Sequence, residues 1–219
     1  MEMKMEYFDH CFIEGDTLET SDVVNGGAEL FLYQSGYLTI KGYDDGVYIL
    51  GFPNFEVRKA LYRVVVPALT MKSNSEVVSA QSFLRKMMQD GNTAEAKKAL
   101  KALIADVPYS NKKMASMDME ERYRLIMSTI FRALGFRVEV ERMLATGRID
   151  MIVEVPSIIY VLELKLSNNG GISAAESQIK EKSYTEPFKA DKRKVIALAV
   201  ELDETGKGLI DWKEVDESL

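Results

Sequence analysis

The chain has 219 residues, and 28 Lys and Arg against 34 Asp and Glu give a formal net charge of −6 with the single histidine neutral. This length fits one or two domains, and 47% hydrophobic with 28% charged residues is typical of a globular protein. The composition excludes a disordered, collagen-like or disulfide-stapled chain, and the acidic total argues against nonspecific coating of nucleic acid. One cysteine, Cys11, and one histidine, His10, exclude an internal disulfide and a zinc site of the usual Cys and His ligands.

The sequence shows no export signal and no membrane-spanning stretch. Its first residues carry acids without an apolar core of signal-peptide length, and no window approaches about 18 uninterrupted apolar residues. We therefore expect a soluble cytoplasmic protein. His10 and Cys11 are not interpreted as a nucleophilic dyad, because neighbours on an extended chain point apart and no third group is evident.

Residues 1–70 are predicted to form a small winged-helix-like domain. In chain order the pattern predicts an irregular or partly extended lead-in (1–26), a helix ending at Gly36 (28–36), a hairpin with an Asp-Asp-Gly turn (37–52), and a helix after the N-cap Asn54 (55–69). Such a unit either grips DNA or packs between domains. If the hairpin of residues 37–52 binds nucleic acid, Lys41→Glu is expected to weaken binding.

Residues 71–115 are predicted to be a helical connector. A first helix covers residues 75–90 and ends at Gly91, and a second covers 93–107 with Asn92 or Thr93 as its N-cap. Periodicity is then lost between Pro108 and Asp118, which predicts a linker.

Residues 116–219 are predicted to form an α/β or α+β domain. The pattern predicts a helix ended by Gly135 (119–134), three strands (136–142, 148–155 and 158–166), a helix (172–188) and a fourth strand (194–202). The second helix would then be the crossover between two parallel strands.

Strand periodicity predicts that three charged residues of this domain lie close together. In IIYVLELKL, Glu163 and Lys165 share the face of two apolar residues, and Asp150 near the start of the preceding strand is positioned to converge with them. Two carboxylates without His or Cys ligands suit a hard cation such as Mg²⁺, and a lysine adds charge stabilisation for phosphodiester hydrolysis. From spacing alone, the simpler interpretation is a solvated Glu163–Lys165 pair with Asp150 capping a turn.

The order of these elements resembles the PD-(D/E)xK nuclease superfamily. The stretches GRIDMIVEV, IYVLELKL, QIKEKSY, KVIALAV and a terminal DW are similar to the nuclease domain that follows an AAA-ATPase-like domain in many bacterial, notably Bacteroides-type, proteins, over roughly residues 116–215. The stretch LFLYQSGYLTIKGYDDGVYILGFPNFEVRKAL is similar to the end of that ATPase-like domain. The resemblance implies a restriction-endonuclease-like mixed central sheet flanked by helices.

The resemblance also implies roles for individual residues. It makes Asp150 and Glu163 ligands of Mg²⁺ or Mn²⁺, with Lys165 catalytic. Glu120, with Glu121 as second choice, is expected to assist, and Gln178 to hold substrate or water; ordinary helix surface is the alternative for Gln178, Lys182 and Tyr184. The residues expected at nucleic acid are Lys182, Tyr184, Lys192 and Arg193. The superfamily's proline before the first motif Asp is missing here, because Arg148 and Ile149 precede Asp150.

The leading hypothesis is a Mg²⁺-dependent nuclease that hydrolyses DNA. Between Lys165 and Lys194, seven basic residues stand against four acidic ones, which favours a phosphate partner although a solvated loop explains part of the excess. The alternative is a noncatalytic nuclease-like scaffold that binds nucleic acid or protein. Homodimer formation is expected by analogy. No phosphate-binding G-x-x-x-x-G-K-[ST] loop occurs, so ATP hydrolysis is not expected, and the chain is interpreted as a piece of a longer protein or a short form without the ATPase.

Overall fold

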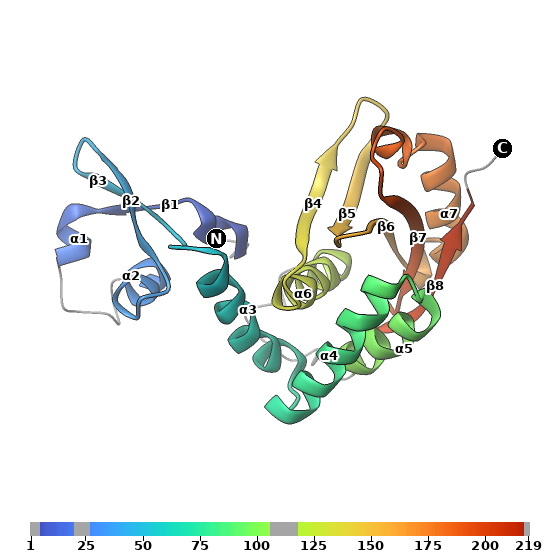
Figure 1. The fold of residues 1–219 in the computed structure, drawn as a ribbon, viewed down its shortest axis with the longest axis horizontal. Coiled ribbons are helices and arrows are strands. Elements are labelled where there is room, and N and C mark those ends of the chain that lie inside the picture. The colour runs from blue at the N-terminus through green and yellow to red at the C-terminus, as the bar shows by residue number, and fades with distance from the viewer. Residues whose placement is uncertain (1–4, 20–26, 106–117, 217–219) are drawn as a thin grey trace. The chain divides into compact units, whose positions relative to one another are not determined.

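The computed structural model describes residues 5–19, 27–105 and 118–216, which divide into two compact units between Tyr62 and Arg63 (Figure 1). The predicted linker lies outside the described residues apart from Asp118, as do residues 1–4 and 20–26 of the predicted lead-in. None of the described helices is long and apolar enough to cross a membrane.

The first unit is built on a three-stranded antiparallel sheet of order β1-β3-β2. Its elements are η1 (Met5–Asp9), β1 (Cys11–Glu14), α1 (Gly15–Glu19), α2 (Gly27–Gln34), β2 (Thr39–Asp44) and β3 (Val47–Gly51). The predicted hairpin forms, and its turn residues Asp45 and Gly46 have φ of 42° and 85°, which suits the twist of a two-residue turn. The strand β1 was not predicted as a strand, because only Cys11 and Ile13 mark its buried face.

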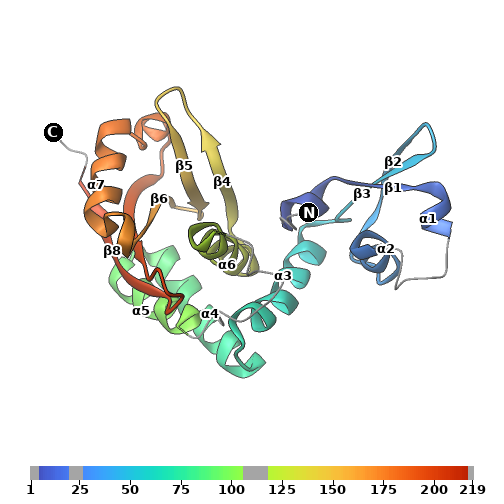
Figure 2. The ribbon, with the colours of Figure 1, turned by 180° about the vertical axis from the view of Figure 1, so that it is seen from behind.

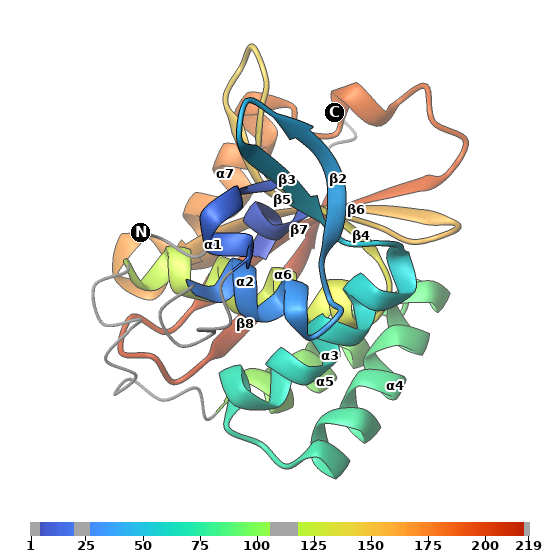
Figure 3. The same ribbon diagram turned by 90° about the vertical axis from the view of Figure 1, so that its left-hand side faces the viewer.

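Three helices follow the hairpin: α3 (Phe55–Thr70), α4 (Asn74–Asp90) and α5 (Thr93–Ile104). Ser73 and Glu76 form a reciprocal capping box at the start of α4, and Gly91 ends it with φ of 73°. The Asn92 side chain accepts from the backbone N–H of Glu95 and so caps α5. The helices α4 and α5 pack along each other as a pair (Figure 3).

The second unit contains a five-stranded sheet of order β4-β5-β6-β7-β8 (Figure 1). Its elements are α6 (Met119–Ala133), β4 (Arg137–Met143), β5 (Arg148–Glu154), β6 (Ile158–Leu166), η2 (Ser167–Asn169), α7 (Gly171–Lys182), η3 (Glu186–Phe188), β7 (Lys194–Leu202) and β8 (Leu209–Val215). β6 and β7 are parallel, joined by the predicted crossover helix, and every other pair is antiparallel. The predicted mixed α/β class is confirmed.

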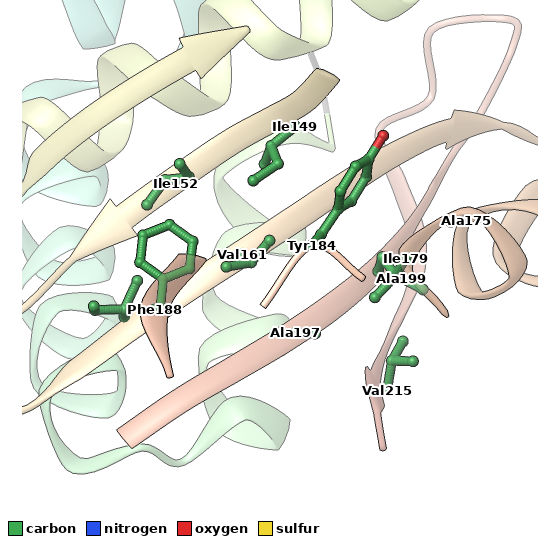
Figure 4. Packing of buried hydrophobic residues seen from close by; sticks show 11 residues of the cluster. Ile149, Ile152, Val161, Ala175, Ile179, Tyr184, Phe188, Ala197, Ala199 and Val215 are labelled. Carbon is green, nitrogen blue, oxygen red and sulfur yellow. The ribbon is translucent and has the colours of Figure 1, made fainter. Parts of the chain in front are cut away.

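The helix α7 packs against β6, β7 and β8 (Figure 2). Strand alternation directs Ile159 and Val161 to this face, where they belong to one buried apolar cluster with Ala175 and Ile179 of the helix. Figure 4 shows Val161, Ala175 and Ile179 in this cluster. These side chains are almost completely removed from water, so the C-terminal half of β6, which carries Glu163, extends from a rigid apolar base.

The structure differs from the sequence prediction in two elements of this unit. The helix expected over residues 172–188 ends at Lys182, because Ser183 adopts φ of 50° and turns Tyr184 into the core, after which η3 forms separately. The edge strand β8 was not predicted, because every third residue is buried instead of every second one. The buried residues are Leu209, Trp212 and Val215.

The helices α4 and α5 lie in the same unit as the sheet. The Tyr160 hydroxyl donates to the Met88 carbonyl at 2.6 Å, and Trp212 Nε1 donates to the Thr93 carbonyl at 2.9 Å. Residues placed in the predicted connector therefore contribute to the packing of the sheet.

Candidate active site

Asp150 and Glu163 stand opposite each other on neighbouring antiparallel strands. Met151 pairs with Leu162, and one step further along β5 and β6 brings the two acids together. Both are buried, with 3% and 0% of their surface exposed. The backbone N–H of Leu164 donates to Asp150 Oδ2 at 2.9 Å, which fixes one oxygen of that carboxylate. The convergence expected from the sequence is therefore present in the fold.

The Glu163 carboxylate is only partly satisfied. Lys165 Nζ donates to Glu163 Oε1 at 2.6 Å, whereas Oε2 is buried and has no hydrogen-bond partner among the described residues. Leaving a buried carboxylate oxygen unpaired is costly, and a cation beside Asp150 would relieve that cost. The donor set fits a hard divalent ion that takes oxygen ligands and keeps several waters. Within the described ranges, no three His, Cys, Asp or Glu side chains are close enough to form a fuller metal cluster.

Burial and neighbouring charge shift the ionisation of this group of residues. Burial, followed by the charge of Asp150, raises the pKa of Glu163 to about 8, although Lys165 acts in the opposite direction. Burial is the largest single effect on Lys165 and lowers its pKa, but the hydrogen bond to Glu163 and the charges of Glu163, Asp150 and Glu120 together raise the lysine pKa. Burial and the charge of Asp150 also raise the pKa of Glu120. The helix α6, which carries Glu120, packs against β5 and β6 beside the same centre.

An arginine that the sequence analysis did not single out joins this cluster. Arg124 Nη1 donates to Glu141 Oε1 at 2.9 Å, and its Nη2 lies 3.3 Å from Glu120 Oε1 and 3.8 Å from Asp150 Oδ1. The four-residue spacing of Glu120 and Arg124 on a helix was a readable signal. Glu141 carried no local signal, because its proximity depends on the pairing of β4 with β5.

Gln178 and Tyr184 form one hydrogen-bonded chain. Gln178 Nε2 donates to the Tyr184 hydroxyl at 2.9 Å, and that hydroxyl donates to the Arg148 carbonyl at 2.7 Å. The Tyr184 ring is fully buried (Figure 4). The chain links α7 to the first residue of β5, two residues before Asp150.

The structure separates the basic residues predicted at nucleic acid. The exposed Lys182 accepts from the Thr146 hydroxyl through its carbonyl, and its side chain passes beside Gly147 in the turn that leads to Asp150. Lys192 and Arg193 instead precede Lys194, which pairs with Ile158, whereas Glu163 pairs with Ala199. Five residues of strand, about 16 Å, separate these two positions.

Arg193 forms ion pairs with carboxylates outside the acidic centre. It pairs with Asp191 at 2.8 Å and with Glu154 at 2.9 Å. The geometry therefore groups Lys182 with the acidic centre and places Lys192 and Arg193 at the other end of the parallel strands.

Comparisons with known proteins bear on the class of the C-terminal segment. Residues 118–212 match the sequence model of the PD-(D/E)XK nuclease superfamily. This segment belongs to that superfamily, as the sequence resemblance implied, and its five-stranded mixed sheet is consistent with a restriction-endonuclease-like fold. The superfamily points to nuclease activity and to the use of divalent metal ions.

A longer curated protein is similar to almost the whole chain. An uncharacterized protein in the vnfD 5′ region of Azotobacter chroococcum mcd 1 is 26% identical over 216 residues, which cover 92% of this chain. The chain spans 40% of the length of that relative. No solved structure matches the chain.

Proposed function

We propose that the C-terminal unit is a Mg²⁺- or Mn²⁺-dependent nuclease that hydrolyses phosphodiester bonds of DNA. The observation that carries the proposal is the juxtaposition of two buried carboxylates with a lysine. The Asp150 carboxylate is anchored at Oδ2, and Glu163 carries an unpaired oxygen on one side and Lys165 at 2.6 Å on the other. A cation site with an adjacent ammonium is suited to the charge of a phosphate undergoing hydrolysis.

In this proposal Asp150 and Glu163 hold the divalent ion. A bound ion would polarise a phosphoryl oxygen and lower the pKa of water at the site. Lys165 has a raised pKa and stays protonated near neutral pH, so it donates to the developing negative charge of the phosphate.

Other residues assist in this proposal. Glu120 adds negative charge from α6, and Gln178 orients substrate or water. Lys182 contacts the nucleic-acid backbone in this proposal, because among the basic residues expected at nucleic acid it is the one beside the turn before Asp150.

The test is cleavage of single-stranded, duplex and branched DNA, with matching RNA, in Mg²⁺ and in Mn²⁺. The variant Glu163→Gln/Lys165→Ala is expected to lose at least about 100-fold in rate. The matched control is Glu176→Gln/Lys213→Ala, which removes an ion pair of 2.7 Å on the same unit and is expected to retain activity. Equal loss in both variants, or none in either, would overturn the proposal.

A noncatalytic scaffold that binds nucleic acid or protein is a second candidate. It is favoured by the hydrogen bond from Lys165 to Glu163, which already pairs that carboxylate with a positive charge. It is also favoured because no three His, Cys, Asp or Glu side chains among the described residues could hold a metal ion together. Calorimetry with Mn²⁺ separates the two candidates. A nuclease centre binds the ion and loses it in Asp150→Ala, whereas a scaffold shows no titratable site at millimolar metal.

The first unit is proposed to be the end of an AAA-ATPase-like domain, on the resemblance of residues 30–61. The longer curated relative leaves room for such a domain, since this chain spans 40% of its length. Fusion of an AAA-ATPase-like segment to the chain would test whether such a domain is required to load the nuclease on DNA. A homodimer is likewise a proposal, which sedimentation of the purified chain would test.

A further inference from the structure

Arg124 lies among three carboxylates at the edge of the candidate centre. Its side chain is 10% exposed, and its terminal nitrogens face Glu120, Glu141 and Asp150 at 3.3, 2.9 and 3.8 Å. Three acids in a poorly hydrated place repel one another unless a positive charge lies between them. Arg124 supplies that charge.

The anchor of Arg124 is Glu141. Glu141 Oε1 lies 2.9 Å from Arg124 Nη1 and 2.9 Å from Arg148 Nη1, so two guanidinium groups share one oxygen. Glu141 also adopts φ of 54°, a left-handed conformation that costs free energy for a residue with a side chain. The two ion pairs offset that cost, and they hold Arg124 beside Asp150.

The contact of Arg124 with Asp150 differs from its other contacts. At 3.8 Å it is too long for a hydrogen bond, so the attraction is electrostatic alone. Asp150 Oδ2 already accepts from the Leu164 N–H, which leaves Oδ1, the oxygen facing Arg124, as the better placed ligand for a cation. A divalent ion at Oδ1 and the guanidinium repel each other, because both are positive and only a few ångströms apart.

We propose that Arg124 is a resident counterion that competes with the divalent cation for Asp150 and thereby weakens metal binding to the centre. The inference rests on the proposed function, since it concerns the same metal site. Arg124 is a positioning residue here: it acts through Asp150 and Glu120. Structural damage lowers metal affinity, whereas removal of a competitor raises it.

The test is calorimetric titration with Mn²⁺ alone. Arg124→Gln is expected to bind Mn²⁺ at least about tenfold more tightly than the wild-type chain. The matched control is Arg142→Gln, which removes an equal charge from the same strand as Glu141; Arg142 pairs with Glu139 at 3.5 Å and lies over the Phe188 ring. The control is expected to bind like the wild type. Equal or weaker binding by Arg124→Gln, or equal tightening in both variants, would overturn the inference.

A second pair of variants tests the inference if Arg124→Gln fails to fold. Glu141→Gln is compared with Glu141→Gln/Arg124→Gln, because removing both partners of the 2.9 Å ion pair avoids a buried uncompensated charge. The double variant is expected to bind Mn²⁺ more tightly than the single one, and equal affinities would overturn the inference.

These outcomes are distinct from failure of the proposed function. Mn²⁺ binding and DNA cleavage by the wild type, with unchanged affinity in Arg124→Gln, would leave the nuclease in place and reject the counterion. Tighter binding by Arg124→Gln without cleavage by any variant would support the counterion and reject the nuclease. Absence of binding in every variant would reject both.

Discussion

The Tyr184 hydroxyl donates a hydrogen bond to the carbonyl of Arg148 at 2.7 Å. Tyr184 follows the end of α7, and Arg148 is the first residue of β5, so this bond ties the crossover helix to the strand that carries Asp150. The same hydroxyl accepts from Gln178 Nε2. Although the sequence placed Tyr184 at nucleic acid, its buried ring suits a role in positioning the start of β5.

Removal of this hydroxyl is expected to loosen the start of β5. Tyr184→Phe keeps the buried ring but leaves the Arg148 carbonyl without its donor, so we expect a loss of about 1 kcal/mol in the free energy of unfolding. We also expect weaker Mn²⁺ binding at Asp150. Urea unfolding and calorimetry check both effects, with Tyr43→Phe, at 62% exposure, as the control. Unchanged stability and metal affinity would show that the bond does not position Asp150.

The burial of Glu163 predicts a pH dependence of stability in metal-free protein. Its pKa is raised from 4.5 to about 8, so between these values the folded chain retains a proton that the unfolded chain has lost. The contribution of Glu163 to stability is therefore full below pH 4.5 and falls as the pH rises towards 8. In EDTA, the unfolding free energy of the wild type should fall more steeply over this range than that of Glu163→Gln. Parallel curves would show that Glu163 does not retain its proton.

The sequence predicted the site best where a local pattern was enough to decide which side chains share a face. Alternation in IIYVLELKL placed Glu163 and Lys165 on one face, and the hydrogen bond between them agrees with that placement. The contacts of Arg124 and Glu141 could not be predicted in this way, because they depend on how α6, β4 and β5 pack together. β8 was missed for a related reason: its buried residues follow the packing of α5 and α7 against it rather than a period of two.

The packing of α5 on β8 predicts that the nuclease-like segment is incomplete without the helical pair. Trp212, the single tryptophan, is 4% exposed and donates to the Thr93 carbonyl at 2.9 Å. A chain that begins at Asp118 is expected to show red-shifted Trp212 emission and lower resistance to urea. A chain that begins at Ser73 keeps α4 and α5 and is expected to match the full chain in emission. Identical emission from both would show that the helices are dispensable.

The separation of the basic residues predicts unequal effects on DNA binding. Lys182 lies beside Gly147 near the acidic centre, whereas Lys192 precedes Lys194, the strand position that lies about 16 Å along the strands from Glu163. Loss of one phosphate contact lowers the slope of log affinity against log salt by about 1. We therefore expect Lys182→Ala to lower that slope and Lys192→Ala, an equal change of charge, to leave it nearly unchanged. The measurement is fluorescence anisotropy of a labelled duplex across a salt series, with Lys165→Ala as the background so that the DNA is not cut. A larger change in Lys192→Ala would instead place the DNA path at the start of β7.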